Sequence, residues 1–404
     1  MQKTSFWKAG HTPTLFASFF YFDLSFMVWV ILGPLAVQIA ADIGLTPAQK
    51  GLMVATPLLA GALLRIVMGV LVDHLQPKKA GMIGQVVVIG GLTWAWLGNL
   101  DTYQSLLSLG LILGVAGAAF AVALPLASRW YPPEHQGTAL GIAGAGNSGT
   151  AIAALFAPSM AIAFGWQNVF GWCLVPLGVA FIVYMVLAKD APSAPAPKPL
   201  IEYLHILKDK DAWWFMFFYS VTFGGFSGLA SSLTIYFHGQ YGLSPVMAGY
   251  FTAGCVFAGS MVRPLGGRMA DRIGGIKTLS IMYIVAAAFL FVASIGLQSE
   301  VAAVIVFVGA MLALGTGNGA VFQLVPQRFR KEIGVMTGMV GMAGGIGGFY
   351  LASSLGVSKQ LTGDYRIGLI IFASLAVVAL IGLSSVKTRW RTTWGSAAMT
   401  TARI

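Results

Sequence analysis

The sequence predicts an all-α membrane protein in which twelve transmembrane helices form two six-helix halves. Composition is the first reason: 57% of the 404 residues are hydrophobic and only 9% are charged, whereas a soluble domain carries about 25% charged residues. The second is that apolar runs of about 20 residues recur along the chain, each long enough to cross a ~30 Å hydrocarbon core as a helix. The third is an internal repeat that relates the first six runs to the last six.

The first six predicted helices cover residues 14–38, 49–72, 80–99, 103–127, 137–162 and 167–188. A hydrophilic segment follows, and its Pro-, Ala- and Ser-rich part predicts an extended linker because it cannot form a membrane helix. The last six helices are predicted at residues 212–237, 247–270, 277–297, 301–325, 333–357 and 366–386. We therefore expect an N-terminal half over 1–188, a cytoplasmic linker over 189–211 and a C-terminal half over 212–404.

The charges predict how the chain is oriented. With the N-terminus inside, loops on that side hold 19 of the 24 Lys and Arg residues, and the opposite side holds only Lys50, Lys359 and Arg366. Such a skew is what the positive-inside rule describes. The formal charge of +11 is then a topology signal that faces anionic lipid and needs no nucleic acid to explain it. Both termini are expected in the cytoplasm.

The repeat is visible in LLAGALLRIVMGVLVDHLQPKKA (58–80) and VFAGSMVRPLGGRMADRIGGIKT (256–278), each of which places one arginine, Arg65 or Arg263, in an apolar run. An offset of 198 aligns the arginines, two glycines and one aspartate of these segments. An offset of 197 aligns Gly137, Gly141 and Gly144 with Gly334, Gly338 and Gly341. Many secondary transporters are built from such repeats, with the binding site at the repeat interface.

The two arginines predict an anion site. A buried Arg costs from about 3 to more than ~10 kcal/mol near the bilayer centre unless it faces a cavity or a partner. Arg65 lies fourteen residues before Lys79, too deep to reach the membrane surface easily. Asp23, the only carboxylate inside a predicted span, cannot neutralise both arginines. Since guanidinium is planar and donates two parallel hydrogen bonds, the missing partner is predicted to be a small monovalent oxyanion.

Two sets of motifs resemble known families. GVLVDHLQPKK (69–79) and GRMADRIGGIK (267–277) resemble the cytoplasmic loop motif of the major facilitator superfamily, and the first copy departs from it at Gln76 and Pro77. AGAGNSG (143–149) and GMAGGIGGF (341–349) resemble the paired signatures of the nitrate/nitrite porter family within that superfamily. One departure is Ala352, where relatives often have Pro. The resemblance implies the major facilitator fold, a bacterial inner-membrane location and nitrate or nitrite as substrate.

The resemblance also implies roles for single residues. Tyr219 matches a substrate-contacting tyrosine, Phe120 matches a wall of the cavity, and Asn147 is expected to contact the ligand. Each has an alternative interpretation, since an aromatic side chain in a membrane helix can serve packing and an Asn can bond between helices. The glycines Gly141, Gly144, Gly338, Gly341 and Gly345 are interpreted as gating positions, or alternatively as packing positions where helices approach closely.

Asp23 is the candidate for proton coupling. A carboxyl group in a low-dielectric site can exchange protons near neutral pH, and relatives with an acidic residue here resemble the nitrate/proton symport branch. We therefore expect import of nitrate with protons, with nitrate/nitrite antiport as the alternative. The alternative interpretations of Asp23 are a residue at a helix end near the cytoplasmic mouth, or a partner for Arg65 or Arg263.

Other functional classes are less favoured. An enzyme would need a nucleophile–base pair or a metal cluster, and GGIKT (274–278) lacks the Gly before Lys that a P-loop requires. We expect neither a catalytic residue nor a cofactor nor a bound metal. A channel is harder to exclude, although a two-fold repeat with matched flexible helices suits alternating access better than an open pore. The strongest rival is another small-anion or drug facilitator, and a wide-specificity exporter would be expected to have a wider cavity without two deep arginines. The predicted partners are nitrate, nitrite, protons and membrane lipid, and the protein is expected to be a monomer.

Overall fold

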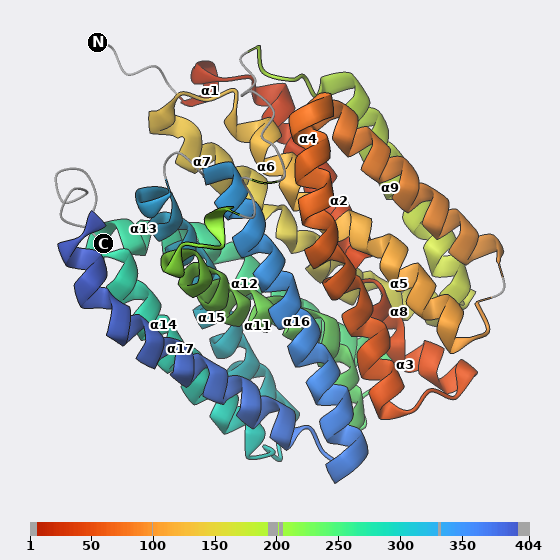
Figure 1. Ribbon diagram of the computed structural model, residues 1–404. Helices are drawn as coiled ribbons and strands as arrows, with labels where there is room; N and C mark the ends of the chain where they lie inside the picture. Colours follow the sequence, from red (N-terminus) through yellow and green to blue (C-terminus); the bar gives the residue numbers. More distant parts are fainter. Residues whose placement is uncertain (1–5, 99, 193–200, 202–204, 330–332, 395–404) are drawn as a thin grey trace.

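The computed structural model describes residues 6–98, 100–192, 201, 205–329 and 333–394. The N-terminal half contains α1 (Phe6–Ala9), α2 (Thr12–Trp29), α3 (Leu32–Ile43), α4 (Pro47–Leu97), α5 (Tyr103–Gly117), α6 (Phe120–Ser128), α7 (Pro133–Gly144), the 3-10 helix η1 (Ala145–Ser148), α8 (Gly149–Phe164) and α9 (Trp166–Leu187). The C-terminal half contains α11 (Lys210–Tyr241), α12 (Pro245–Met261), α13 (Arg263–Ile273), α14 (Gly275–Ser294), α15 (Glu300–Arg328), α16 (Ile333–Thr362) and α17 (Arg366–Thr392). The described residues contain helices and no strands (Figure 1).

Ten helical segments of the described residues are long and apolar enough to cross a membrane. One of them is α4, in which the chain reverses direction at Gln76 and so supplies two crossings (Figure 1). The more polar α11 supplies the remaining crossing. These segments account for the twelve predicted helices, although the first extends to Ile43 instead of residue 38.

Several crossings are interrupted where the sequence places small residues or proline. The fifth crossing changes from α7 through η1 to α8 at the segment AGNS. The eighth breaks at Val262, and Pro264 follows in the first turn of α13, where a missing backbone N–H costs no helical bond. These interruptions fall next to Asn147 and Arg263, so they set the positions of two predicted site residues.

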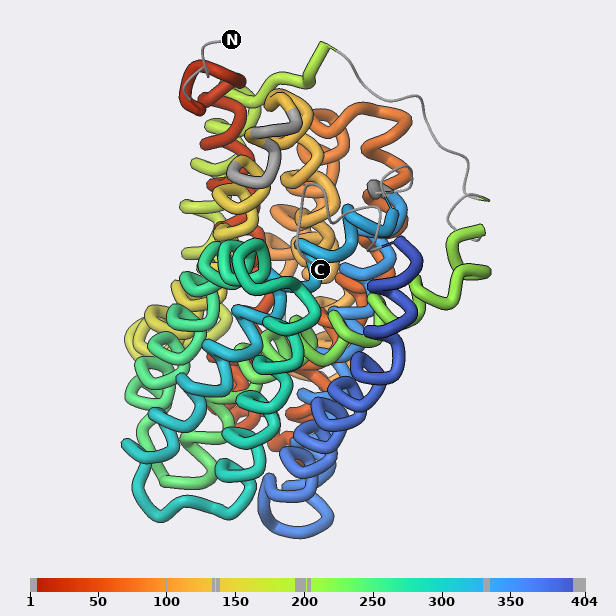
Figure 2. Tube along the Cα trace, turned by 90° about the vertical axis from the view of Figure 1, so that its left-hand side faces the viewer, coloured from red at the N-terminus to blue at the C-terminus, as the bar shows by residue number. Residues whose placement is uncertain are grey.

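The two ends of the bundle differ in how closely the halves approach. We call the end that holds α1 and the last turn of α17 the terminal end, and the opposite end, with the turns after Ile43, Tyr241 and Thr362, the distal end (Figures 1 and 2). At the distal end α4 packs on α16 and α8 packs on α12. A Cβ atom added at Gly51 would lie 2.8 Å from Gly356 Cα, and one at Gly249 would lie 2.5 Å from Ala154 O. Since only glycine permits such an approach, the distal end is closed.

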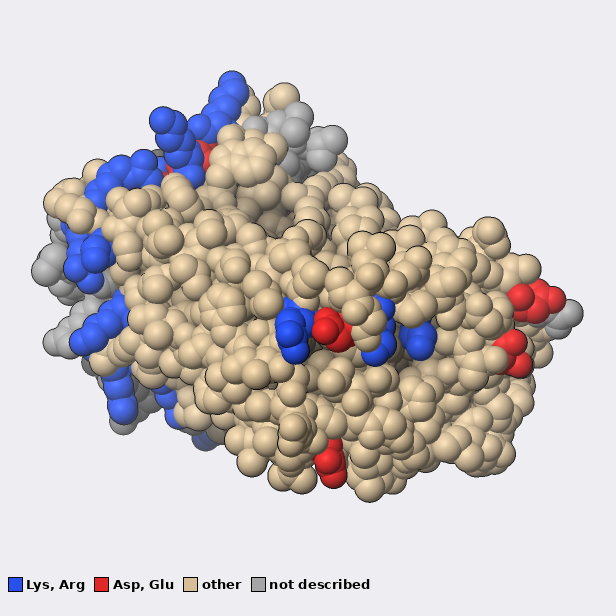
Figure 3. Space-filling view, turned by 90° about the horizontal axis from the view of Figure 1, so that it is seen from below, with Lys and Arg blue, Asp and Glu red and all other residues tan. Residues whose placement is uncertain are grey.

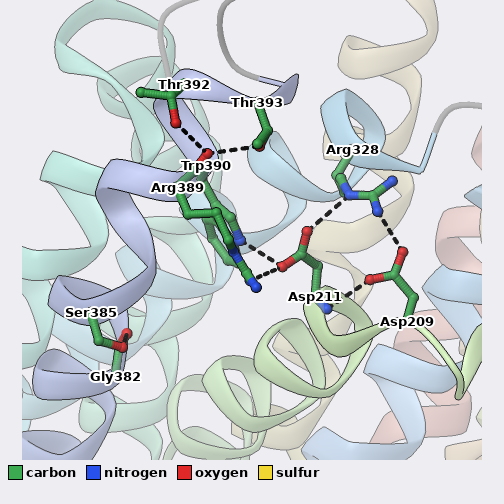
Figure 4. A network of polar contacts seen from close by, with 9 residues as sticks. All are labelled: Asp209, Asp211, Arg328, Gly382, Ser385, Arg389, Trp390, Thr392 and Thr393. Carbon is green, nitrogen blue, oxygen red and sulfur yellow. Dashed lines mark hydrogen bonds and ion pairs between the residues drawn. The ribbon is translucent and has the colours of Figure 1, made fainter.

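Each end of the linker is bound to its own half. Lys189 N donates to Thr14 Oγ1 at 2.9 Å, and Asp190 Oδ1 accepts from Lys78 N at 2.9 Å. On the other side, Asp211 accepts from Arg328 Nε at 3.0 Å and from Trp390 Nε1 at 2.8 Å, and forms an ion pair with Arg389 (Figure 4). Asp209 pairs with Arg328 as well. The predicted Pro/Ala/Ser-rich part of the linker lies largely outside the described residues.

Candidate functional site

Arg65 lies on the first crossing of α4 and is 1% exposed. Its guanidinium donates through Nη1 to the carbonyl oxygen of Gly341 in α16, and through Nε to that of Gly117 at 3.3 Å. A Cβ atom at Gly341 would lie 3.3 Å from Arg65 Nη1. Because position 341 has no side chain, Arg65 of the N-terminal half can reach the backbone carbonyl of Gly341 in the C-terminal half.

Arg263, the repeat equivalent of Arg65, makes the reverse connection. Its Nη2 donates to Tyr219 Oη at 3.2 Å within the C-terminal half. Its Nη1 lies 3.1 Å from Asn147 Oδ1 of η1, with the Asn147 amide oriented so that its nitrogen donates to Gly144 O, also at 3.1 Å. Gly144 and Gly341 are equivalent in the repeat, so each arginine is linked to the glycine-rich helix of the opposite half, Arg65 directly and Arg263 through Asn147.

Aromatic rings bring the two guanidinium groups into one site. The Phe223 ring centroid lies 5.3 Å from Arg65 Cζ and 5.8 Å from Arg263 Cζ. Phe120 lies 5.2 Å from Arg65 Cζ, and Tyr219 stacks on Phe223 with centroids 5.2 Å apart. Each such cation–ring contact contributes about 0.5–2 kcal/mol. Phe120 therefore lies beside Arg65 and Tyr219 beside Arg263, while their predicted contacts with a substrate stay predictions.

The charge of this site is uncompensated. Among the described residues, no carboxylate oxygen lies within 4 Å of either Arg65 or Arg263. Arg65 Nη2 is buried and has no hydrogen-bond partner, and an unsatisfied buried charged donor is costly. The arrangement can therefore bind an anion between two cationic groups, with ring faces and edges as the walls.

Asp23 is placed differently from either alternative interpretation. It lies in the interior of α2, is 6% exposed, and accepts a hydrogen bond from Ser148 Oγ at 2.7 Å. The interpretations as a helix-end residue and as an ion-pair partner of Arg65 or Arg263 are therefore wrong. The physical reason is that η1 turns Ser148 toward α2, which gives the carboxylate a neutral donor. Ser148 directly follows Asn147, which contacts Arg263. The Asp23 carboxyl group is therefore bonded to the residue next to the site.

The five predicted gating glycines fall into two groups. A Cβ atom at Gly345 would lie 2.7 Å from Ala62 Cβ, and Gly341 lies against Arg65, so α16 uses both for close approach to α4. At Gly141, Gly144 and Gly338 an added Cβ atom would meet nothing within 4 Å. These three face open space on the side of the site toward the terminal end, and in this conformation packing does not require glycine there.

Three aromatic residues of the site are absent from the residues that the sequence singled out. Phe223 contacts both arginines, Trp29 lies 5.7 Å from Arg65 Cζ, and Phe322 meets the Tyr219 ring edge-on at 4.9 Å between centroids. Phe223 follows Tyr219 by four residues and so lies on the same helix face. That spacing is a signal that could have identified it. Trp29 and Phe322 carry no comparable signal, because only the tertiary packing brings them to Arg65 and Tyr219.

Comparisons with known proteins agree with this architecture. Residues 15–352 match the family described as Major Facilitator Superfamily. The protein named "Probable nitrate/nitrite transporter NarK2" of Mycobacterium tuberculosis (strain ATCC 25618 / H37Rv) is 34% identical over 88% of this chain and 91% of its own length. The "Nitrite extrusion protein" of Bacillus subtilis (strain 168) is 31% identical over 88% of this chain and 89% of its own.

Solved structures resemble the fold. A bacterial homologue of the human lysosomal transporter Spinster, in an inward-facing and occupied conformation, has a TM-score of 0.70 at 17% identity and covers 94% of this chain and 97% of its own. The human organic anion transporter MFSD10 (TETRAN) has a TM-score of 0.69 at 13% identity and covers 92% of this chain and 99% of its own. At these identities the likeness shows the fold. With the matched family and relatives above, it follows that the chain is a membrane transporter that belongs to the major facilitator superfamily and, within it, to the nitrate/nitrite porter family.

Proposed function

We propose that the protein imports nitrate across the inner membrane of a bacterium by alternating access, with the anion bound between Arg65 and Arg263. The observation that carries this is the pair of guanidinium groups with no carboxylate within 4 Å among the described residues. Nitrate is planar, stays ionised at cellular pH and accepts hydrogen bonds in its plane, which matches the donor geometry of guanidinium. The names of the relatives, nitrate/nitrite transporter and nitrite extrusion protein, favour this anion over others.

The reciprocal contacts suggest how binding drives the conformational change. Arg65 and Arg263 each bond to the opposite half, so an anion that takes over these donors would weaken the links between the halves at the site. Only a ligand with different affinity for the two conformations can shift their populations. The anion would therefore bind more tightly to the conformation in which it replaces the bonds from Arg65 to Gly341 and from Arg263 to Asn147. It would be released from the conformation in which those bonds re-form.

Coupling to protons is proposed through Asp23. Entry of an anion into a negative interior is opposed by about 2.3 kcal/mol per charge per 100 mV, and co-transport with two or more protons reverses that penalty. The hydrogen bond from Ser148 to Asp23 connects the carboxyl group to η1, and Asn147 of η1 bonds to Arg263. Protonation of Asp23 makes the carboxyl group a weaker acceptor for Ser148 and adds an O–H donor, so it would alter the position of η1 beside the anion. Exchange for nitrite is the second candidate, because the matched relatives are named for both anions.

The test is uptake of labelled nitrate into proteoliposomes, with the pH gradient and the internal nitrite concentration varied independently. Proton coupling predicts accumulation driven by an inward proton gradient with no nitrite inside. Uptake that ignores the pH gradient and requires internal nitrite would establish exchange instead. A protein that moves neither anion under any of these conditions would refute the proposed substrate.

The proposed orientation has its own test. Reporters fused at Met1 and Ile404, both outside the described residues, and in the 190–211 loop should all report the cytoplasm, since the basic residues concentrate on that side. A periplasmic signal from any of the three would contradict the orientation. In the proposed orientation the terminal end, which holds α1 and the last turn of α17, faces the cytoplasm.

A further inference from the structure

A pocket far from the arginines lies at the distal end, between the first turns of α4, the last turns of α16 and the neighbouring part of α11. Its volume is about 100 Å³, several times the ~10–15 Å³ that one water molecule needs on the same measure. The pocket therefore suits a small ligand. Because α4 belongs to one half and α16 and α11 to the other, its walls come from both halves.

Two lysines from opposite halves line this pocket, Lys50 of α4 and Lys359 of α16. In the described part of the chain neither amine lies within 4 Å of a carboxylate oxygen, and no carboxylate lines the pocket. Lys359 Nζ donates to Gly363 O at 2.7 Å and lies 5.2 Å from the centre of the Tyr365 ring. An ammonium group has three donors, so both lysines have donors left for a ligand.

A buried hydroxyl group lines the same pocket. Ser232 of α11 is 5% exposed, and its Oγ is buried without a hydrogen-bond partner. Buried polar groups in folded proteins nearly always have a partner. Two cationic donors and one neutral donor therefore meet in a pocket whose lining includes no acidic side chain.

The location makes these charges unusual. Lys50, Lys359 and Arg366 are the only basic residues predicted on this side of the membrane, and of these Arg366 is tied to Asp364. Seen from below, basic side chains gather near the middle of the face with an acidic side chain among them, and the surrounding surface is mostly uncharged (Figure 3). Like charges on the two halves repel each other when the distal end closes, and an anion between them would remove that repulsion.

We propose that this pocket is a second anion site, which takes a small inorganic anion at the distal face and, because Lys50 and Lys359 come from opposite halves, holds the distal end closed. A ligand that binds only the closed arrangement shifts the population toward it. The inference concerns a different site from that of the proposed function and does not require that nitrate be transported.

The test measures the distance across the distal end by pulsed electron paramagnetic resonance, with spin labels at Ala41→Cys on α3 and Leu361→Cys on α16. Both positions are exposed, whereas the native Cys173 and Cys255 are buried. The protein is prepared in gluconate, and nitrate or chloride is then added. We expect either small anion to raise the closed population at least twofold.

The variant Lys50→Gln/Lys359→Gln should be more closed than the unsubstituted protein in gluconate, because the repulsion is gone, and should not respond to added chloride. Lys50→Gln alone should lose at least half of the response, which keeps the test available if the double variant folds poorly. Arg366→Gln is the matched control, since it removes one positive charge at the same end but outside this pocket. It should respond like the unsubstituted protein.

A double variant that still closes fully on addition of chloride would overturn the inference, since the central arginines would then account for the response. A response to nitrate but not chloride, lost in the double variant, would support a site that selects a planar oxyanion. Nitrate uptake by the double variant is measured in parallel and should be retained at saturating nitrate. Failure of uptake in the unsubstituted protein would refute the proposed function and leave the closure result standing.

Discussion

The backbone at Gln76 adopts a conformation that glycine takes up far more readily than other residues. Gln76 has φ 69° and ψ 152° and is the only described non-glycine residue with positive φ. Its repeat equivalent, at the offset of 198, is Gly274, with φ 96° and ψ 139°. This region of backbone space is essentially restricted to glycine and costs other residues about 1–3 kcal/mol. The first copy of the loop motif thus departs from the family pattern at a position where the structure still demands glycine.

The expected gain from Gln76→Gly can be worked out. Removing the strain contributes about 1–3 kcal/mol, and the greater freedom of glycine in the unfolded chain returns roughly 0.4–1 kcal/mol. The described residues give the half-buried Gln76 side chain no hydrogen bond that would be lost. Gln76→Gly should therefore stabilise the protein by about 1 kcal/mol, the middle of a range that runs from roughly 0 to 2.6 kcal/mol. Gly274→Gln should destabilise it by a similar amount.

The measurement is equilibrium unfolding in mixed micelles titrated with SDS, followed by circular dichroism. Lys79→Gly serves as a control because it introduces glycine at a helical position of the same element, where glycine costs roughly 0.5–1 kcal/mol. If Gln76→Gly destabilises the protein as the control does, the backbone at Gln76 is not strained. If Gly274→Gln leaves the free energy of unfolding unchanged, position 274 does not require glycine.

Three further predictions concern transport. Arg65→Lys and Arg263→Lys keep the charge but lose the planar donor pair. The loss of one hydrogen bond to a charged group, about 1.5–3 kcal/mol, should lower nitrate uptake roughly 10- to 150-fold while the protein still inserts. Near-normal uptake by either variant would show that its arginine has a structural role. Gly341→Leu crowds Arg65 and should weaken nitrate binding. At Gly144 an added Cβ atom has nothing within 4 Å, so Gly144→Leu should spare binding but stall transport. Equal loss of binding in both leucine variants would contradict this distinction. Asp23→Asn should abolish accumulation driven by a pH gradient while leaving nitrate/nitrate exchange largely intact; unchanged accumulation would remove Asp23 from the coupling mechanism.

The sequence predicted the crossings well, because an apolar run long enough to span a membrane is a local property. It also predicted that Arg65 and Arg263 share a site, because the repeat places them at equivalent depth. It could not predict that Arg65 bonds to Gly341 or that Phe223 lies beside both arginines. Those contacts join residues far apart in the chain, and they depend on how the halves meet. The partner of Asp23 was missed for the same reason, since the turn at η1 decides where Ser148 points.

The anchoring of the linker has a consequence for how the molecule can be taken apart. Lys189 and Asp190 are held by the helices that precede them, and Asp209 and Asp211 are held by the helices that follow (Figure 4). A break in the chain between these two anchors would leave both sets of bonds intact. Two separately encoded fragments, divided within 191–208, should therefore each retain their native end and reassemble in the membrane into a working carrier. The covalent connection would then serve mainly to supply the fragments in equal number.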